Sequence, residues 1–164
     1  MEAIRGGLAG AAAADLYAGS GAVGLEALSR GAADVLLVEA DGRAARVIRE
    51  NIALVGLQGA RLVTDKVGRA LGRGPEGAAP RDFVFADPPY AAGEDEIGAV
   101  LTALLQPGWL VPGALVAVER ATRSGPLTWP TGYESDRSRR YGEATVWYGL
   151  AAGAHPDAIP PTGE

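Results

Sequence analysis

The chain contains no cysteine and only one histidine, His155, among its 164 residues. The absence of cysteine excludes disulfides, thiolate zinc sites and cysteine nucleophiles. A single histidine near the C-terminus effectively excludes histidine-based metal sites and Ser-His-Asp triads, and we assign it no role. Any chemistry must therefore come from carboxylates, backbone groups, hydroxyls, aromatic rings or a bound cofactor, and we expect no metal.

Long apolar runs are also missing, since none approaches the roughly 18 residues of a membrane span. With 48% apolar residues, the composition is that of a soluble globular protein. The first residues include charged Glu2 and Arg5 but no long apolar core, so we expect no signal peptide and a cytoplasmic protein. The net charge of −5 argues against a broad electrostatic surface for nucleic acid.

Apolar runs alternate with segments of helical composition along the chain. A continuous apolar run such as residues 35–39 is typical of a strand buried on both faces. The alternation predicts an α/β fold, with a doubly wound, Rossmann-like and mostly parallel sheet covered by helices on both faces. We expect strands at residues 11–18, 35–39, 61–64, 82–86, 114–119 and 144–150, and helices at residues 23–30, 41–55, 66–71 and 94–105.

The length and composition predict one folded domain. A chain of this length can bury a single core but not two. We expect a short N-terminal segment at residues 1–14, a domain at residues 15–150, and a disordered tail at residues 151–164, where proline and glycine are frequent.

Residues 19–24 (GSGAVG) fit the pattern G-x-G-x-x-G between a predicted strand and a predicted helix. Glycines permit a tight turn and a close approach of the backbone to a ligand, and the helix N-terminus offers free N–H groups. Glu39 ends the second strand, where a carboxylate can accept hydrogen bonds from both hydroxyls of a ribose. The pattern predicts a nucleotide-containing cofactor, either a dinucleotide or S-adenosylmethionine (SAM).

Asp15 distinguishes these two cofactors, because it lies four residues before Gly19. A carboxylate facing a pyrophosphate would have the wrong sign of charge, whereas a carboxylate beside the ammonium group of a methionine moiety would be favourable. SAM is therefore the favoured cofactor, and a dinucleotide-dependent dehydrogenase is the remote alternative.

Residues 87–90 read Asp-Pro-Pro-Tyr directly after an apolar strand. The two prolines fix φ and remove two N–H donors, so the turn is nearly rigid. The Asp87 side chain and the Pro88 carbonyl can then accept both hydrogens of an exocyclic amine, which favours a pyramidal nitrogen whose lone pair can attack a methyl group. Tyr90 offers a ring on which a base can stack. Together with Pro89, these are the predicted catalytic residues.

The segments DLYAGSGAVGLEALSRGA, VEAD, DFVFADPPY and VAVER resemble the RsmD-type 16S ribosomal RNA guanine-N2 methyltransferases, a family of SAM-dependent class I enzymes. The similarity extends over residues 15–150 and implies a seven-stranded class I methyltransferase sheet. It also implies methylation of the N2 amine of a guanine in 16S rRNA, in an assembling 30S particle, and places Asp65 near the adenine ring. The residues expected to bind SAM are Asp15, Tyr17, Gly19, Ser20, Gly21, Glu39, Ala40, Asp65 and Asp87.

The densest basic cluster lies between the fifth predicted strand and the last. We expect it to bind RNA phosphates, with a tyrosine stacking on a base; the alternative is a solvated loop. Glu119 and Arg120, at the end of the fifth strand, are expected either to line the same cleft or to pair with neighbouring residues. The candidate RNA-binding residues are Arg137, Arg139, Arg140 and Tyr141.

Members of the family usually carry a basic segment before the glycine loop, whereas the fourteen residues before Asp15 are mostly glycine and alanine. We therefore expect an N-terminally shortened variant that binds SAM better than RNA. Two alternatives stay open beside guanine-N2 methylation. One is a DNA or RNA methyltransferase that uses the same turn on the amine of adenine or cytosine. The other is a SAM-binding domain that is inactive for lack of an RNA-binding arm.

Overall fold

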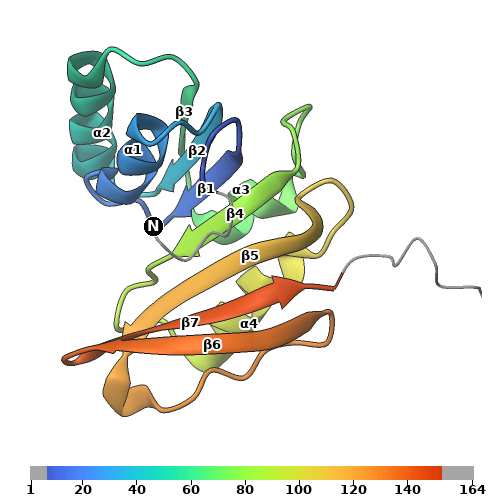
Figure 1. Ribbon diagram of the computed structural model, residues 1–164. Helices are drawn as coiled ribbons and strands as arrows, with labels where there is room; N and C mark the ends of the chain where they lie inside the picture. Colours follow the sequence, from blue (N-terminus) through green and yellow to red (C-terminus); the bar gives the residue numbers. More distant parts are fainter. Residues whose placement is uncertain (1–6, 153–164) are drawn as a thin grey trace, which may run out of the picture.

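The computed structural model describes residues 7–152, in which seven strands form one sheet (Figure 1). Residues 12–14, the last three of the predicted N-terminal segment, belong to the first strand of this sheet. Residues 153–164 of the predicted tail lie outside the described residues. The elements are β1 (Ala12–Leu16), α1 (Ala22–Ser29), β2 (Asp34–Glu39), α2 (Gly42–Val55), β3 (Ala60–Thr64), α3 (Val67–Gly72), β4 (Arg81–Ala86), α4 (Glu94–Leu104), β5 (Leu110–Ala121), a 3-10 turn (Thr122–Ser124), β6 (Tyr133–Tyr141) and β7 (Ala144–Ala151).

The strand order is β3-β2-β1-β4-β5-β7-β6. The first five strands pair in parallel, while β7 is antiparallel to both β5 and β6. The chain order reverses between β1 and β4, so their carboxyl ends lie side by side at the switch point of the sheet, where doubly wound folds bind ligands. The predicted α/β class and the mostly parallel sheet are confirmed.

Helices cover both faces of this sheet (Figure 1). One core contains residues of α1 and α2, among them Leu28 and Ile48, against Val35 and Leu37 of β2. The other core contains residues of α3 and α4 against the alternate residues of the same strands. Because both sides of β2 are buried, its apolar run is continuous, as predicted. Among residues 7–152, no helix combines the length and apolar character needed to cross a membrane.

For the segment between the fifth predicted strand and the last, the predicted alternative of a solvated loop is wrong. The segment forms β6, an edge strand that pairs along its length with β7. All of its residues except Tyr133 are exposed, so it has no alternation of apolar and polar residues to indicate a strand. Pairing with the largely buried β7 is what makes it extended. A register shift between Ser135 and Arg137 interrupts the pairing.

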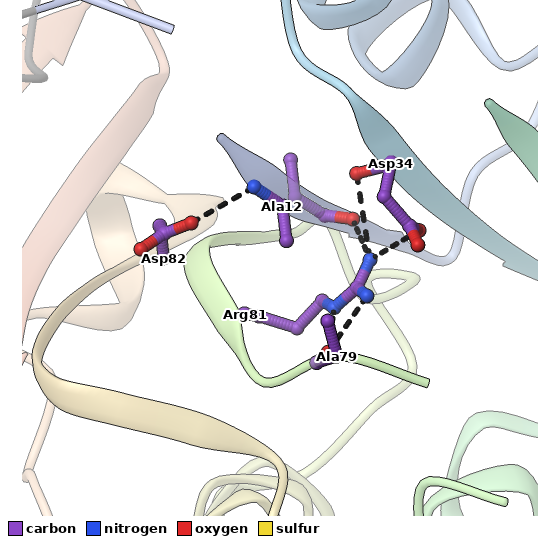
Figure 2. Close-up of polar contacts among 6 residues, drawn as sticks. Ala12, Asp34, Ala79, Arg81 and Asp82 are labelled. Carbon is purple, nitrogen blue, oxygen red and sulfur yellow. Dashed lines mark hydrogen bonds and ion pairs between the residues drawn. The ribbon is translucent and has the colours of Figure 1, made fainter. Parts of the chain in front are cut away.

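Arg81, the first residue of β4, is completely buried, and its guanidinium lies near the amino ends of β1 and β2 (Figure 2). Its Nη1 donates to the Ala13 carbonyl at 3.0 Å and to Asp34 Oδ1 at 2.8 Å, while its Nε and Nη2 donate to the Ala79 carbonyl at 2.9 and 2.7 Å. The adjacent Asp82 accepts from the Ala12 amide at 2.8 Å. One guanidinium thus joins β1, β2 and the segment leading into β4.

Replacing Arg81 with Ala removes the donor to the buried Ala13 carbonyl and the ion-pair partner of Asp34, and it opens a cavity. We expect Arg81→Ala to lower the free energy of unfolding by about 3 kcal/mol or more, measured by urea denaturation. Arg81→Lys, which keeps the charge but not the planar fork, should lose less. The control is Arg30→Ala, because Arg30 forms an exposed pair with Glu26 and should cost about 0.5 kcal/mol or less. Equal losses for Arg81→Ala and Arg30→Ala would contradict this role.

Candidate active site

The predicted catalytic and cofactor-binding residues lie at the carboxyl edge of the sheet, where the structure has two cavities. The larger, of about 760 Å³, lies between the ends of β1 and β2 and the helices α3 and α4. The smaller, of about 310 Å³, lies between the turn after β4 and the end of β5. Asp87 and Pro89 line both cavities. The Asp-Pro-Pro-Tyr turn is therefore a wall between two spaces.

The larger cavity brings together residues that are distant in the sequence. Of the predicted cofactor-binding residues, Tyr17, Glu39, Ala40 and Asp87 line it. Sequence analysis missed its apolar wall, although the spacing of the small and apolar residues on α4 could have indicated one face of a helix. That wall consists of Val67, Ala99, Val100 and Ala103.

Glu39 holds the glycine loop against the end of β2. Its Oε1 accepts from the Gly19 amide and its Oε2 from the Asp41 amide, both at 2.8 Å. Gly21 has φ of 82° and begins α1, a conformation that strongly favours glycine. At Gly24, a Cβ would lie 2.8 Å from a methyl carbon of Leu37, so this glycine permits close packing of α1 on β2.

Asp15 is turned into the protein and does not line the larger cavity. Its carboxylate accepts from the Gly24 amide at 2.9 Å, which satisfies one free N–H in the first turn of α1. Gly21 has no side chain that could provide this bond. The pKa of Asp15 is raised to about 7, mainly by burial; the charges of Asp87 and Glu39 add to this rise, and the hydrogen bond from Gly24 opposes it.

Gly19, Ser20, Gly21 and Asp65 are also not among the residues that line the larger cavity. The Ser20 carbonyl accepts from Asn51 Nδ2 at 3.1 Å. Asp65 accepts a hydrogen bond from Arg73, and this bond holds the pKa of its carboxyl below the usual range. Asp65 directly precedes Lys66, which does line the cavity.

Tyr17 lies on the cavity wall with φ of 59°, an uncommon conformation for a residue other than glycine. Its hydroxyl donates a long hydrogen bond of 3.5 Å to Glu96 Oε1. Burial, together with the neighbouring Glu96 charge, raises the pKa of Tyr17 to about 12. Tyr17 therefore stays neutral near pH 7.

The turn after β4 is held at both ends by backbone bonds. The Asp87 amide donates to the Leu16 carbonyl at 3.3 Å, and the Ala92 amide donates to the Pro89 carbonyl at 2.8 Å. Tyr90 projects from this turn with 81% of its surface exposed. The smaller cavity beside it is lined by Asp87, Pro88, Pro89, Tyr90, Ala92, Glu94, Ile97, Glu119, Arg120, Ala121, Ser124 and Ala144.

Asp87 has a carboxylate partner in Glu119, a contact that sequence analysis did not predict. β4 and β5 pair in parallel with Ala86 opposite Val118, so the two acids follow at neighbouring positions, and their side chains form a hydrogen bond. Burial is the main cause that raises the pKa of both carboxyls, and the Asp87 charge raises that of Glu119 further. One proton is therefore shared by the pair to a higher pH than usual.

Arg120 is buried and lines the smaller cavity, where its guanidinium holds the surrounding backbone in place. It donates to the carbonyls of Ser124, Gly125 and Pro126 at 2.7 to 3.2 Å and forms an ion pair with Glu94. It therefore both lines the cleft and pairs with a neighbouring acid, which fixes the turn after β5 relative to the start of α4.

The predicted RNA-binding residues share β6 but do not form one cluster. The Arg139 guanidinium lies 5.3 Å from the Tyr141 ring centroid, and that of Arg137 lies 5.0 Å from Tyr148. Arg137 lines a cavity at the amino ends of β4 and β5, away from Asp87. Arg140 lines a different cavity, together with Tyr90. The structure thus separates Arg137 from Arg140.

The strand order, the glycine loop after β1, the acid ending β2 and the rigid turn after β4 define a Rossmann-like class I methyltransferase fold. The profile of the family described as "Conserved hypothetical protein 95" matches residues 2–149. The chain belongs to this family, and the predicted resemblance to RsmD-type proteins is confirmed.

Three relatives illustrate the similarity. "Ribosomal RNA small subunit methyltransferase D" of Escherichia coli K12 is 35% identical over 129 residues, which is 79% of this chain and 63% of that protein. Its Haemophilus influenzae namesake is 32% identical over 71% of this chain and 59% of its own length. The solved structure of Escherichia coli yhhF is 31% identical, with a TM-score of 0.78 over 89% of this chain and 80% of that chain. The matched region thus spans less than two thirds of the two curated relatives.

The raised pKa of Asp15 makes stability depend on pH. Between the ordinary pKa of 3.8 and about 7, the folded state keeps a proton that the unfolded state has lost, so stability falls as pH rises through this window. Asp15→Asn keeps an acceptor for Gly24 and cannot ionise. We expect this variant to gain stability relative to wild type from pH 4 to pH 7, with no further change above it.

Urea denaturation at successive pH values measures this difference. Asp95→Asn, on the exposed surface of α4, controls for the general effect of replacing a carboxyl with an amide. A constant difference between Asp15→Asn and wild type across the window would show that Asp15 is not buried in its neutral form.

Proposed function

We propose that this chain transfers a methyl group from SAM to the exocyclic N2 amine of a guanine in 16S rRNA, in an assembling 30S particle in the cytoplasm. The observation that carries the proposal is that the turn containing Asp87 and Pro89 lines two cavities at once. A methyl donor in one cavity and a base in the other would meet at this turn. The names of the relatives support ribosomal RNA as the substrate, and the family resemblance supports guanine N2.

The larger cavity suits SAM in its size and in the chemistry of its lining. Its volume of about 760 Å³ falls within the range of roughly 300–1,000 Å³ for ligand pockets. Glu39 can bind ribose hydroxyls at one side, and the wall from α3 and α4 offers an apolar surface to an adenine ring. Glu39 and Asp87 line the cavity and place carboxyl groups near a cationic ligand. SAM supplies a methyl group on a positively charged sulfonium sulfur.

The smaller cavity would hold the target base. Ionised Asp87 and the Pro88 carbonyl accept hydrogen bonds from the amine, which directs its lone pair away from the ring system. Tyr90 is exposed and can stack on the base, a contact worth about 1–3 kcal/mol in single-strand binders. Asp87 can also accept the proton that the nitrogen loses on methylation. Positioning therefore carries much of the catalysis.

Glu119 sets the protonation of Asp87. When the pair holds a proton, Asp87 is engaged with Glu119 and is a weaker acceptor for the amine. When the proton leaves, both oxygens of Asp87 become available. Glu119 is therefore a positioning residue that makes the acceptor sensitive to pH.

RNA outside the target nucleotide would contact β6. Arg139 and Tyr141 are exposed and lie together, so they can bind a phosphate and stack on a base. We assign Arg137 and Arg140 to the same bound RNA, at different points along the strand.

Incubation of the protein with labelled SAM and 30S particles from cells lacking the modification tests the proposal. We expect label at the N2 of a guanine. We further expect Asp87→Ala to lower kcat by about a hundredfold or more, because an acceptor made for the reacting amine is lost, while SAM affinity changes little. Asp95→Ala, at an exposed position of α4, is the control and should retain activity.

Other outcomes of this experiment identify the alternatives. SAM binding without transfer would contradict the proposal and favour a SAM-binding domain. Label on adenine or cytosine would favour an amino-methyltransferase of different specificity. A simultaneous loss of transfer and SAM binding in Asp87→Ala would contradict the division of roles between the two cavities.

Glu119→Gln removes the second charge from the pair but keeps a polar partner for Asp87. The Asp87 charge delays the ionisation of Glu119, which is the last proton that the pair releases, and this second ionisation is absent in Glu119→Gln. We expect the acidic limb of the pH profile of kcat/KM to move to lower pH. Glu50→Gln, at an exposed position of α2, should leave the profile unchanged. An unchanged acidic limb in Glu119→Gln would show that the pair does not control the reaction.

A further inference from the structure

A third cavity, of about 420 Å³, adjoins the smaller one and has no role in the reaction described above. Three segments that are separate in the sequence form it: the turn after β4, the 3-10 turn after β5, and the hairpin between β6 and β7. Tyr90 and Ala121 line both this cavity and the one beside Asp87. Its lining residues are Tyr90, Ala121, Thr122, Arg123, Arg140 and Glu143.

The cavity wall is held in place by bonds between the 3-10 turn and the hairpin. The Thr122 amide donates to the Glu143 carbonyl at 2.7 Å. The Thr122 hydroxyl lies 3.2 Å from the Gly142 carbonyl and 2.8 Å from Thr145 Oγ1, within hydrogen-bond distance of both. The buried Arg120 also donates hydrogen bonds to the carbonyls of Ser124, Gly125 and Pro126, at the end of the same turn and just after it. Such a cavity is preorganised, so a ligand would lose little free energy in ordering it.

Two arginines at this cavity lack carboxylate partners within residues 7–152. Arg123 is exposed and forms no ion pair there, and Arg140 forms one hydrogen bond, from Nε to the Gly142 carbonyl at 2.9 Å. This bond orients the Arg140 guanidinium and leaves its terminal NH₂ groups for a ligand. Glu143 is the one carboxylate in the lining, so the cavity carries a net positive charge in a protein of net charge −5.

Most other arginines within residues 7–152 pair with acids; Arg43, Arg49 and Arg139 do not, but none of these three lines this cavity. Ion pairs with Asp or Glu engage Arg30, Arg46, Arg61, Arg69, Arg73, Arg81, Arg120 and Arg137. Two arginines without such partners, next to an exposed tyrosine, form the combination that binds a nucleotide. The guanidinium binds phosphate through paired hydrogen bonds, and the ring stacks on a base.

We propose that this cavity is a subsite for the RNA nucleotide adjacent to the target base, with its phosphate bound by Arg123 and Arg140. The proposal rests on the proposed function, because it takes the cavity beside Asp87 as the target site. Tyr90 lines both cavities, so bases in the two cavities would belong to consecutive nucleotides. A phosphate held here would keep the strand in place while the target base leaves its stack, a step that enzymes acting on a flipped base require.

Substitution of the two arginines tests the subsite in the full chain. The double variant Arg123→Ala/Arg140→Ala should raise KM for an rRNA substrate about tenfold or more, while kcat and SAM affinity stay within about twofold. The slope of log KM against log salt concentration should become shallower by about one for each phosphate contact that is lost. Arg46→Ala, at an exposed position of α2, is the matched control and should change neither KM nor the salt slope.

A purely structural role for the arginines would lower stability without changing the salt slope, so the slope distinguishes the two roles. Unchanged KM and slope in the double variant, with transfer by wild type intact, would overturn the subsite while leaving the proposed function standing.

A second measurement covers the case in which wild type transfers no methyl group to any RNA, so that the proposed function fails. Fluorescence anisotropy then compares the binding of one labelled rRNA fragment by wild type and by the double variant. Weaker binding with a shallower salt slope would support a nucleotide site at these arginines. Equal binding would overturn it.

Discussion

The buried Arg81 guanidinium is the interaction on which the rest of the structure depends. It joins β1, β2 and the entry to β4 at their amino ends. Because parallel strands rise by the same distance per residue, fixing their beginnings also fixes where they end. Asp15, Glu39 and Asp87 occupy those ends. A cation at one edge of the sheet thus sets the relative positions of acids at the opposite edge, although it touches none of them.

The carboxyl edge brings more carboxyl groups close together than stability alone would favour. Asp15 closes the first turn of α1, but its burial near Asp87 and Glu39 raises the cost of ionising it. Asp87 and Glu119 likewise hold a proton between them. Like charges kept close in a partly desolvated site raise the free energy of the empty protein, and a cationic ligand would lower it again. The same residues therefore weaken the fold and favour binding.

The sequence predicted the sheet class, the glycine loop and the rigid turn, because each depends on local patterns such as the apolar run of β2 or two adjacent prolines. The rest required tertiary information. β6 is almost wholly exposed, so no periodicity indicated a strand. The inward orientation of Asp15 depends on the Gly24 amide, and the contact between Asp87 and Glu119 depends on the register of β4 and β5. The cavity at Arg123 is formed by three segments that no single motif connects.

The edge strand β6 also has a consequence for how the protein behaves in solution. An exposed strand with free backbone groups can pair with the edge of another molecule and start aggregation. The arginines of β6 and the shift in register near Asp136 oppose such pairing, because they bring like charges together and bend the strand. Residues suited to contact a polyanion would therefore also keep copies of the protein apart until that polyanion is present.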